Sequence, residues 1–244
     1  MKLRHLASAA AFATLAVCST ASWSVNYQMI DLVSPNHALS AMTSGYKYPA
    51  PGDYMFGDVP YRIGTPDVDG FNIWHSADYP PQQRTQTYEL PINVFGATEV
   101  YTVMNIWWGV AQSQVATVEF FGSAGATYTK ALVVGEDLRD HVVGGFVDTV
   151  NGTSTIQVFQ DAIDDGEAHV RLDRQTFVLP AEFTNQTLER MVITNLTSVV
   201  AETDGQGQTF LVAATVAAVP EPQSYALMLA GAGLLAWRMR KRAA

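Results

Sequence analysis

Apolar and polar residues alternate in many short segments of this chain of 244 residues, and this alternation limits its fold more than any other feature. Segments 116–120 and 170–173 each place apolar side chains on one face and polar side chains on the other. Successive side chains of a strand point to opposite sides, so both segments predict half-buried antiparallel strands. Glycine and Asx turn signals separate them from further strand predictions at 132–134, 155–159, 176–179, 188–194 and 209–216.

Segment 100–108 differs because it is apolar on both faces. One face carries Val100, Met104 and Ile106, and the other carries Tyr101, Val103 and Trp107. This pattern predicts a central strand that is buried on both sides, or one that is closed under a loop.

Short strands with little helical periodicity between them predict an all-β fold, an antiparallel β-sandwich of the jelly-roll type. Residues 22–218 have the length of one domain. Within it, the many prolines and glycines of residues 44–98 predict a loop-rich region around short strands at 59–63 and 71–74.

The order of these segments resembles a galactose-binding-like jelly roll. The resemblance lies in the run 59–63, a tryptophan strand ending at Trp74 and His75, the segment 90–104, and closing strands around 188–193 and 210–216. Carbohydrate-binding modules and accessory domains of glycoside hydrolases have this architecture, so the resemblance implies sugar binding without establishing it.

The last residues of the chain form a three-part signal. Pro220, Glu221 and Pro222 precede an apolar run at 225–237, and a basic cluster of Arg238, Arg240, Lys241 and Arg242 follows. As a helix the run would span about 20 Å against a hydrocarbon core of about 30 Å, which makes it a marginal anchor. The basic cluster predicts that the chain's end stays in the cytoplasm and the domain lies outside.

These residues resemble the PEP-CTERM sorting signal of Gram-negative bacteria that make exopolysaccharide. The resemblance implies recognition by an exosortase, a membrane transpeptidase or protease, and removal of the apolar tail beyond about Pro222. It therefore predicts that residues 219–244 are a sorting segment, with the membrane as a partner through the helix before processing.

The N-terminus predicts export as well. Lys2, Arg4 and His5 precede an apolar run at 6–17 and a small-residue cleavage site, so residues 1–21 predict a secretory signal peptide. The sole cysteine, Cys18, lies in this peptide, and segment 15–18 resembles a lipoprotein box except at Val17. Without the peptide the chain has no cysteine for a disulfide, a thiolate metal site or a nucleophile.

Charge narrows the class of partner. The whole chain has 14 basic and 23 acidic residues, and removal of both terminal segments leaves 8 basic and 22 acidic residues, a net charge of about −14. This charge argues against nucleic acid, polyanionic sugars and anionic membrane surfaces as partners. Neutral glycans, cations and other proteins stay open.

Neither catalytic motifs nor histidine spacing indicate an enzyme. The chain has no Gly-x-Ser-x-Gly elbow, His-Glu-x-x-His motif, Walker loop or Gly-x-Gly-x-x-Gly motif. His37, His75, His141 and His169 have no metal-ligand spacing. The many carboxylates contain numerous candidate glycosidase pairs, and the sequence does not select one.

Two features predict binding. Asp161, Asp164, Asp165 and Glu167 lie in one short segment, which predicts either a Ca²⁺ site or a solvated acidic turn. No other cofactor is indicated.

The aromatic residues Trp74, Tyr79, Trp107, Trp108 and Tyr128 include rings near predicted loops, where a flat face could stack on a sugar. Core packing is the alternative for each ring. We assign the sugar-binding rim to Trp74, His75 and Tyr79 and expect Trp107 to lie in the core.

The sequence therefore predicts a non-enzymatic protein of the cell envelope, cell surface or extracellular matrix. Its expected role is structural or adhesive, with exopolysaccharide as the carbohydrate partner. Two alternatives stay open, an enzyme acting on extracellular polysaccharide and a purely structural matrix component.

Overall fold

The computed structural model describes residues 25–42, 47–76, 87–161, 169–196 and 207–219, and the helical positions Ala230, Gly231, Leu234 and Arg238. Outside these residues lie the predicted signal peptide and the predicted site residues Tyr79, Asp164, Asp165, Glu167, Pro220, Glu221, Pro222, Arg240, Lys241 and Arg242. Among the residues that the structure describes, no helix has the length and hydrophobicity of a membrane span.

Two antiparallel sheets form a sandwich. The central sheet has the order β1 (Asn26–Ile30), β12 (Gln208–Ala218), β6 (Ala97–Trp107), β10 (Arg171–Val178), β9 (Thr155–Gln160), and the short β4 (Trp74–His75) also pairs with β12. The second sheet has the order β5 (Thr87–Phe95), β11 (Thr187–Asn195), β7 (Gln114–Gly122), β8 (Thr127–Val133). The predicted all-β antiparallel sandwich is confirmed, and the arrangement is consistent with a jelly roll.

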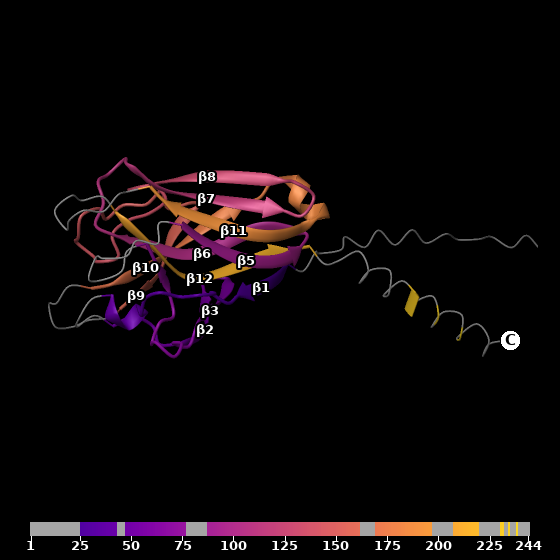
Figure 1. Cartoon of the computed structure of the whole chain (residues 1–244), viewed down its shortest axis with the longest axis horizontal. Helices are drawn as coiled ribbons and strands as arrows, with labels where there is room; N and C mark the ends of the chain where they lie inside the picture. The colour runs from indigo at the N-terminus through magenta and orange to yellow at the C-terminus, as the bar shows by residue number, and fades with distance from the viewer. Residues whose placement is uncertain are drawn as a thin grey trace, which may run out of the picture.

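A hairpin and two short 3₁₀ helices supplement the sheets. The hairpin joins β2 (Gly52–Phe56) to β3 (Val59–Ile63), and the helices are η1 (Leu39–Ala41) and η2 (Ala181–Asn185). In Figure 1 the hairpin lies on one side of the central sheet, and the second sheet lies on the other. The central sheet is therefore covered on both faces.

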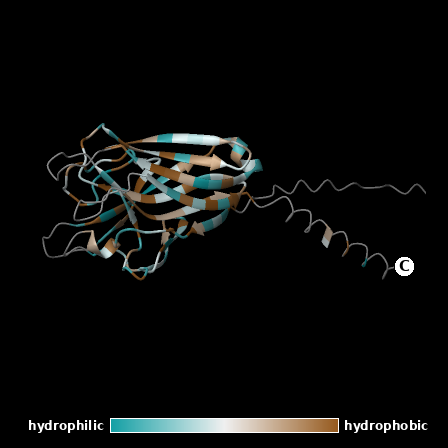
Figure 2. Ribbon diagram, viewed as in Figure 1, coloured by the Kyte–Doolittle hydropathy of each residue, from teal (hydrophilic) through white to brown (hydrophobic). Residues whose placement is uncertain are grey.

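Both faces of the central sheet accordingly carry a hydrophobic core. Val100, Met104 and Ile106 of β6 belong to the core between the two sheets. Tyr101 and Val103 belong to the core under the hairpin, and Trp107 packs against that core while partly exposed. Figure 2 shows hydrophobic residues distributed along the strands of both sheets. The prediction of a central strand buried on both sides is confirmed.

Different pairs of strand ends define the two ends of the sandwich. At one end Asn26 of β1 pairs with Ala218 of β12, so the first and last described strands meet there. At the other end Gln208 of β12 pairs with Trp107 of β6. Strands rise about 3.4 Å per residue, so the eleven residues of β6 separate the two ends by about 34 Å. We call the end at Trp107 the distal end.

Candidate functional site

A buried ion pair supports the distal end from below. Arg139 donates to both carboxylate oxygens of Asp173 in β10, at 2.8 and 2.6 Å. Asp173 is fully buried and also accepts a hydrogen bond from Asn105 Nδ2 at 2.7 Å. A bidentate pair with a further amide donor fixes both side chains in one geometry. The chain that follows Arg139 therefore starts from a rigid point.

The side chain of Arg171 holds the loop at residues 140–148 by binding main-chain atoms of that loop. Its guanidinium donates to the carbonyl oxygens of Asp140, Val142 and Val147 at 2.9, 3.2 and 3.3 Å. It also forms an ion pair with Asp148 at 2.5 Å. Carbonyl oxygens on both arms of the loop thus bind one planar cation, which keeps the loop closed.

Asp140 connects this loop to the turn after β6. Its Oδ1 accepts the main-chain N–H of Val142 at 2.7 Å, and its Oδ2 accepts the N–H of Trp108 at 2.8 Å. Burial raises the pKa of the Asp140 carboxyl, while the two amide hydrogen bonds lower it. One buried carboxylate therefore fixes two loops relative to each other.

Trp108 has a left-handed backbone, with φ of 57°. This conformation is rare for a bulky residue and costs roughly 1–3 kcal/mol. The next residue, Gly109, has φ of 140° and leaves no room for a side chain, because a Cβ there would lie 2.5 Å from Ile106 Cδ1. The turn after β6 thus directs a tryptophan toward the end of the sandwich at the expense of backbone strain.

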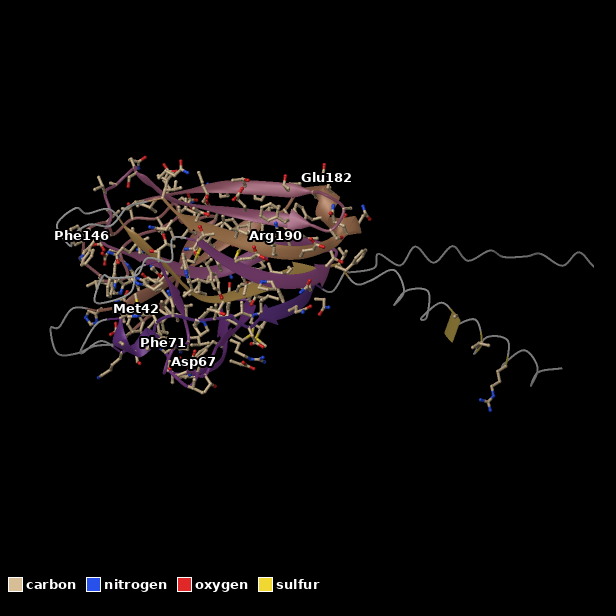
Figure 3. All side chains as sticks on the ribbon, viewed as in Figure 1. Met42, Asp67, Phe71, Phe146, Glu182 and Arg190 are labelled. Atoms are coloured by element: carbon tan, nitrogen blue, oxygen red, sulfur yellow. The ribbon has the colours of Figure 1, made fainter. Side chains whose placement is uncertain are left out.

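The two fixed loops present apolar side chains to solvent. Phe146, at the tip of the 140–148 loop, is 58% exposed, and Val110 is 53% exposed. The ring of Trp108 is half-buried and meets the ring of Phe146 edge to face, with centroids 6.4 Å apart. Figure 3 shows Phe146 at the end of the sandwich opposite Glu182 of η2. We call Trp108, Val110 and Phe146 the aromatic rim.

Below the aromatic rim lies a buried group of rings. Trp107 contacts His75 edge to face at 4.9 Å between centroids, Trp108 at 5.7 Å and His141 at 6.0 Å. The Tyr48 hydroxyl forms a short hydrogen bond with Nδ1 of His141. Burial lowers the pKa of His141 to about 3, and the nearby His75 and Arg171 act in the same direction. His141 is therefore neutral at ordinary pH and serves this packing as an uncharged ring.

The expected exposure of Trp74 and His75 is wrong. Trp74 is 1% exposed and stacks on Tyr88 at 5.2 Å between centroids, within the core between the sheets. His75 has no exposed surface and packs against Trp107 and Phe210. Their short strand pairs with Phe210 and Leu211 near the distal end of β12, and both rings are buried, so neither ring can stack on a sugar. Of the three tryptophans that the structure describes, Trp107 and Trp108 reach the surface, and both are half-buried.

Of the four predicted calcium ligands, only Asp161 is described. Its Oδ1 accepts the N–H of Val170 at 2.9 Å and lies 3.6 Å from Nδ1 of His169. Among the residues that the structure describes, no three His, Cys, Asp or Glu side chains are grouped as metal ligands would be. The calcium site stays a prediction about the segment that includes Asp164, Asp165 and Glu167.

Sequence reasoning missed the two linked loops. The Gly144-Gly145 pair indicated a turn, but Arg171, which binds the residues on both sides of that pair, lies on β10, more than twenty residues away. Asp140 likewise pairs across the fold with an amide of another loop. The adjacent tryptophans Trp107 and Trp108 were the one local signal for the aromatic rim.

Comparisons with known proteins bear on the C-terminal segment. Residues 218–242 match the model of the PEP-CTERM protein-sorting motif. This motif marks proteins that are exported to the cell envelope or surface and sorted by an exosortase. No curated protein matches the chain. The match begins at Ala218, the last residue of β12.

Proposed function

We propose that this exported protein is a non-catalytic component of the cell envelope or extracellular matrix that binds neutral carbohydrate, such as exopolysaccharide, through the aromatic rim. The observation that carries the proposal is the strained, half-buried Trp108 held beside the exposed Phe146 by Asp140. Two loops fixed in advance lose little entropy when a ligand arrives, and exposed rings offer flat apolar faces to a sugar.

The charge of the domain favours a neutral ligand. The two arginines that hold these loops are already committed, since Arg139 binds Asp173 and Arg171 binds Asp148. An anionic polysaccharide would find an excess of acidic residues and no free cation in these two pairs. Ring stacking on a neutral sugar needs no such cation.

The carboxylates at this end support binding better than catalysis. Asp140 accepts two main-chain amides, and Asp148 and Asp173 each pair with an arginine. A general acid or base must instead be free to reach a substrate proton. These three groups have structural roles, and a polysaccharide-acting enzyme would need carboxylates from elsewhere in the chain.

The position of the sorting motif suits this role. The motif continues from the end of β12, about 34 Å from the aromatic rim along the strand direction. While the C-terminal segment engages the membrane or the exosortase, the aromatic rim would lie on the remote end of the domain. An adhesive surface placed there can reach material outside the cell.

A glycan array combined with a reducing-sugar assay tests the proposal. The wild-type protein should bind neutral glycans, and Phe146→Ala should bind about 5- to 150-fold more weakly, as expected for loss of roughly 1–3 kcal/mol of ring stacking. Val68→Ala is the matched control, because Val68 is fully exposed in the turn beside Asp67, away from the aromatic rim. Wild-type protein that binds no glycan refutes the carbohydrate role, and release of reducing sugar supports the enzyme alternative.

A further inference from the structure

The last strand of the domain is locked on both sides. β12 lies between β1 and β6 in the central sheet, and each of its eleven residues is buried. Its final pairs are Ala218 with Asn26 on one side and Ala218 with Ala97 on the other. The match to the PEP-CTERM sorting motif begins at this same Ala218. The matched segment therefore begins within the folded sheet.

Val219 extends this main-chain pairing by one residue. Its main-chain N–H donates to the carbonyl oxygen of Gly96 at 2.9 Å. Gly96 has φ of 72°, and a Cβ at this position would lie 2.8 Å from Cγ2 of Val219 and 3.2 Å from its carbonyl oxygen. The turn between β5 and β6 can therefore approach Val219 this closely only because residue 96 is glycine.

Enzymes that cut peptide bonds bind an extended stretch of several residues. Residues within β12 already use their strand edges for β1 and β6 and cannot enter another protein's cleft without opening the central sheet. Opening a central, fully buried strand requires close to the free energy of global unfolding.

We infer that the folded sandwich sets the limit of processing, so that the exosortase gains access to the chain only beyond Val219 and the mature protein keeps β12 whole. Hydrolysis there breaks one peptide bond and adds one water, leaving a carboxylate on the domain and an amino group on the released tail. Transfer to an amine would leave an amide on the domain in place of the carboxylate. Processing by exosortase belongs to the proposed function, and the limit at Val219 rests on it.

The order of events follows from the same geometry. β12 is the last described strand in the sequence, and it lies between β1 and β6. Until β12 pairs, β1 and β6 both lack their shared neighbour in the central sheet. Folding must place β12 before the protein can resist a cut upstream of Val219. A chain whose sheet is incomplete would expose residues 208–218 to the same enzyme.

Two matched glycine variants test the limit. Gly96→Ala puts a methyl group against Val219 and should open the end of β12. Gly152→Ala is the control, because Gly152 has a closely similar φ of 70° and no atom near the added methyl. The purified full-length chain in detergent is treated with proteinase K, and intact-mass analysis locates the C-termini of the first products. The same analysis is applied to protein from a host that carries an exosortase.

Wild type and Gly152→Ala should give domain products that end at or beyond Val219. Gly96→Ala should give products that end within β12 at a rate about 5- to 30-fold higher than Gly152→Ala, because only at residue 96 does the added methyl group clash with Val219. A main wild-type product that ends before Ala218, or identical cutting of the two glycine variants, overturns the limit. Glycan binding is measured on the same samples, so loss of the carbohydrate role is recognised separately. A chain that stays full-length in the host refutes exosortase processing, while proteinase K still reports the limit.

Discussion

The main-chain N–H of Trp108 donates to Oδ2 of Asp140 at 2.8 Å, and this single bond joins the turn after β6 to the loop that carries Phe146. The other carboxylate oxygen of Asp140 accepts the N–H of Val142 within its own loop. Each oxygen of this carboxylate is a strong acceptor for one main-chain N–H, and burial of the carboxylate excludes competing water. The spatial relation between the two rings of the aromatic rim therefore depends on a side chain that is itself hidden.

Replacement of Asp140 by Asn should loosen both loops. The amide group of Asn keeps one acceptor oxygen but points an NH₂ donor at a main-chain N–H, so one buried hydrogen bond is lost. We expect the free energy of unfolding to fall by about 1–3 kcal/mol and glycan binding to weaken. Urea unfolding and glycan titration measure the two effects.

Asp67 offers a matched control for this change. Its Oδ1 also accepts two main-chain amides, those of Asp69 and Phe71, at 2.9 Å each, but in an exposed turn. Figure 3 shows Asp67 and Phe71 well away from Phe146. Asp67→Asn should leave glycan binding unchanged. Equal binding by wild type and Asp140→Asn would show that the link between the loops has no role in recognition.

Trp108→Gly should separate stability from binding. Glycine adopts the left-handed backbone of residue 108 without strain, which offsets part of the packing that the ring provides. The free energy of unfolding should therefore change by no more than about 1 kcal/mol, whereas glycan binding should be lost. Trp108→Ala removes the same ring but keeps the strain, so it should be less stable than Trp108→Gly. The reverse order of stability would contradict the role assigned to this backbone.

Trp74→Ala should destabilise the domain severely. Trp74 is buried against Tyr88 in the core between the sheets, and truncation of such a ring costs about 3–5 kcal/mol. Trp107→Ala should cost less, because Trp107 is partly exposed. Chemical unfolding of both variants gives the comparison. A stable Trp74→Ala variant with weakened glycan binding would restore Trp74 as a binding residue.

Part of the strand pattern was predictable because several strands carry their own signal. Period-two alternation at 116–120 and the two apolar faces of 100–108 both reappear in β7 and β6. The apolar face of a strand follows from the alternation of residues within a short segment, so the sequence of that segment predicts it.

The placement of single rings was not predictable in the same way. The loop-rich surroundings suggested an exposed rim at Trp74, yet residues 74–75 pair with β12, which lies more than a hundred residues later, and their rings are buried. Trp107 and Trp108 are adjacent, and only the backbone turn at Trp108 decides which ring meets Phe146. The Arg139–Asp173 and Arg171–Asp148 pairs likewise depend on which loop folds against β10. Contacts of this kind are set by tertiary structure.

The predicted calcium site can be tested by chelation. Oδ2 of Asp161 is buried and has no hydrogen-bond partner among the described residues, so it is available as an oxygen ligand. If the segment through Glu167 binds Ca²⁺, chelator should lower the melting temperature and added Ca²⁺ should restore it, because the ion would bind only the folded state. An Asp164→Asn and Asp165→Asn double variant should not respond. A wild-type melting temperature that neither chelator nor Ca²⁺ changes rules the site out.

Acid should destabilise the domain through His141. Burial lowers the pKa of His141 to about 3, whereas the same side chain in the unfolded chain has a pKa of about 6.5. Between these values the unfolded state binds one more proton than the folded state, so stability rises with pH. The full contribution is present above about pH 6.5 and is lost as the pH falls toward 3, at about 1.4 kcal/mol per pH unit from this group.

His141→Gln should flatten this part of the pH dependence, because glutamine carries no titrating proton and still accepts the Tyr48 hydroxyl. Tyr48→Phe is the control: it removes the hydrogen bond but keeps the buried imidazole, so the slope should persist. Urea unfolding of the three proteins at several pH values from 4 to 7.5 gives the slopes. Parallel curves for wild type and His141→Gln would mean that His141 accepts a proton in the folded protein, and that the ring group below the aromatic rim opens to water.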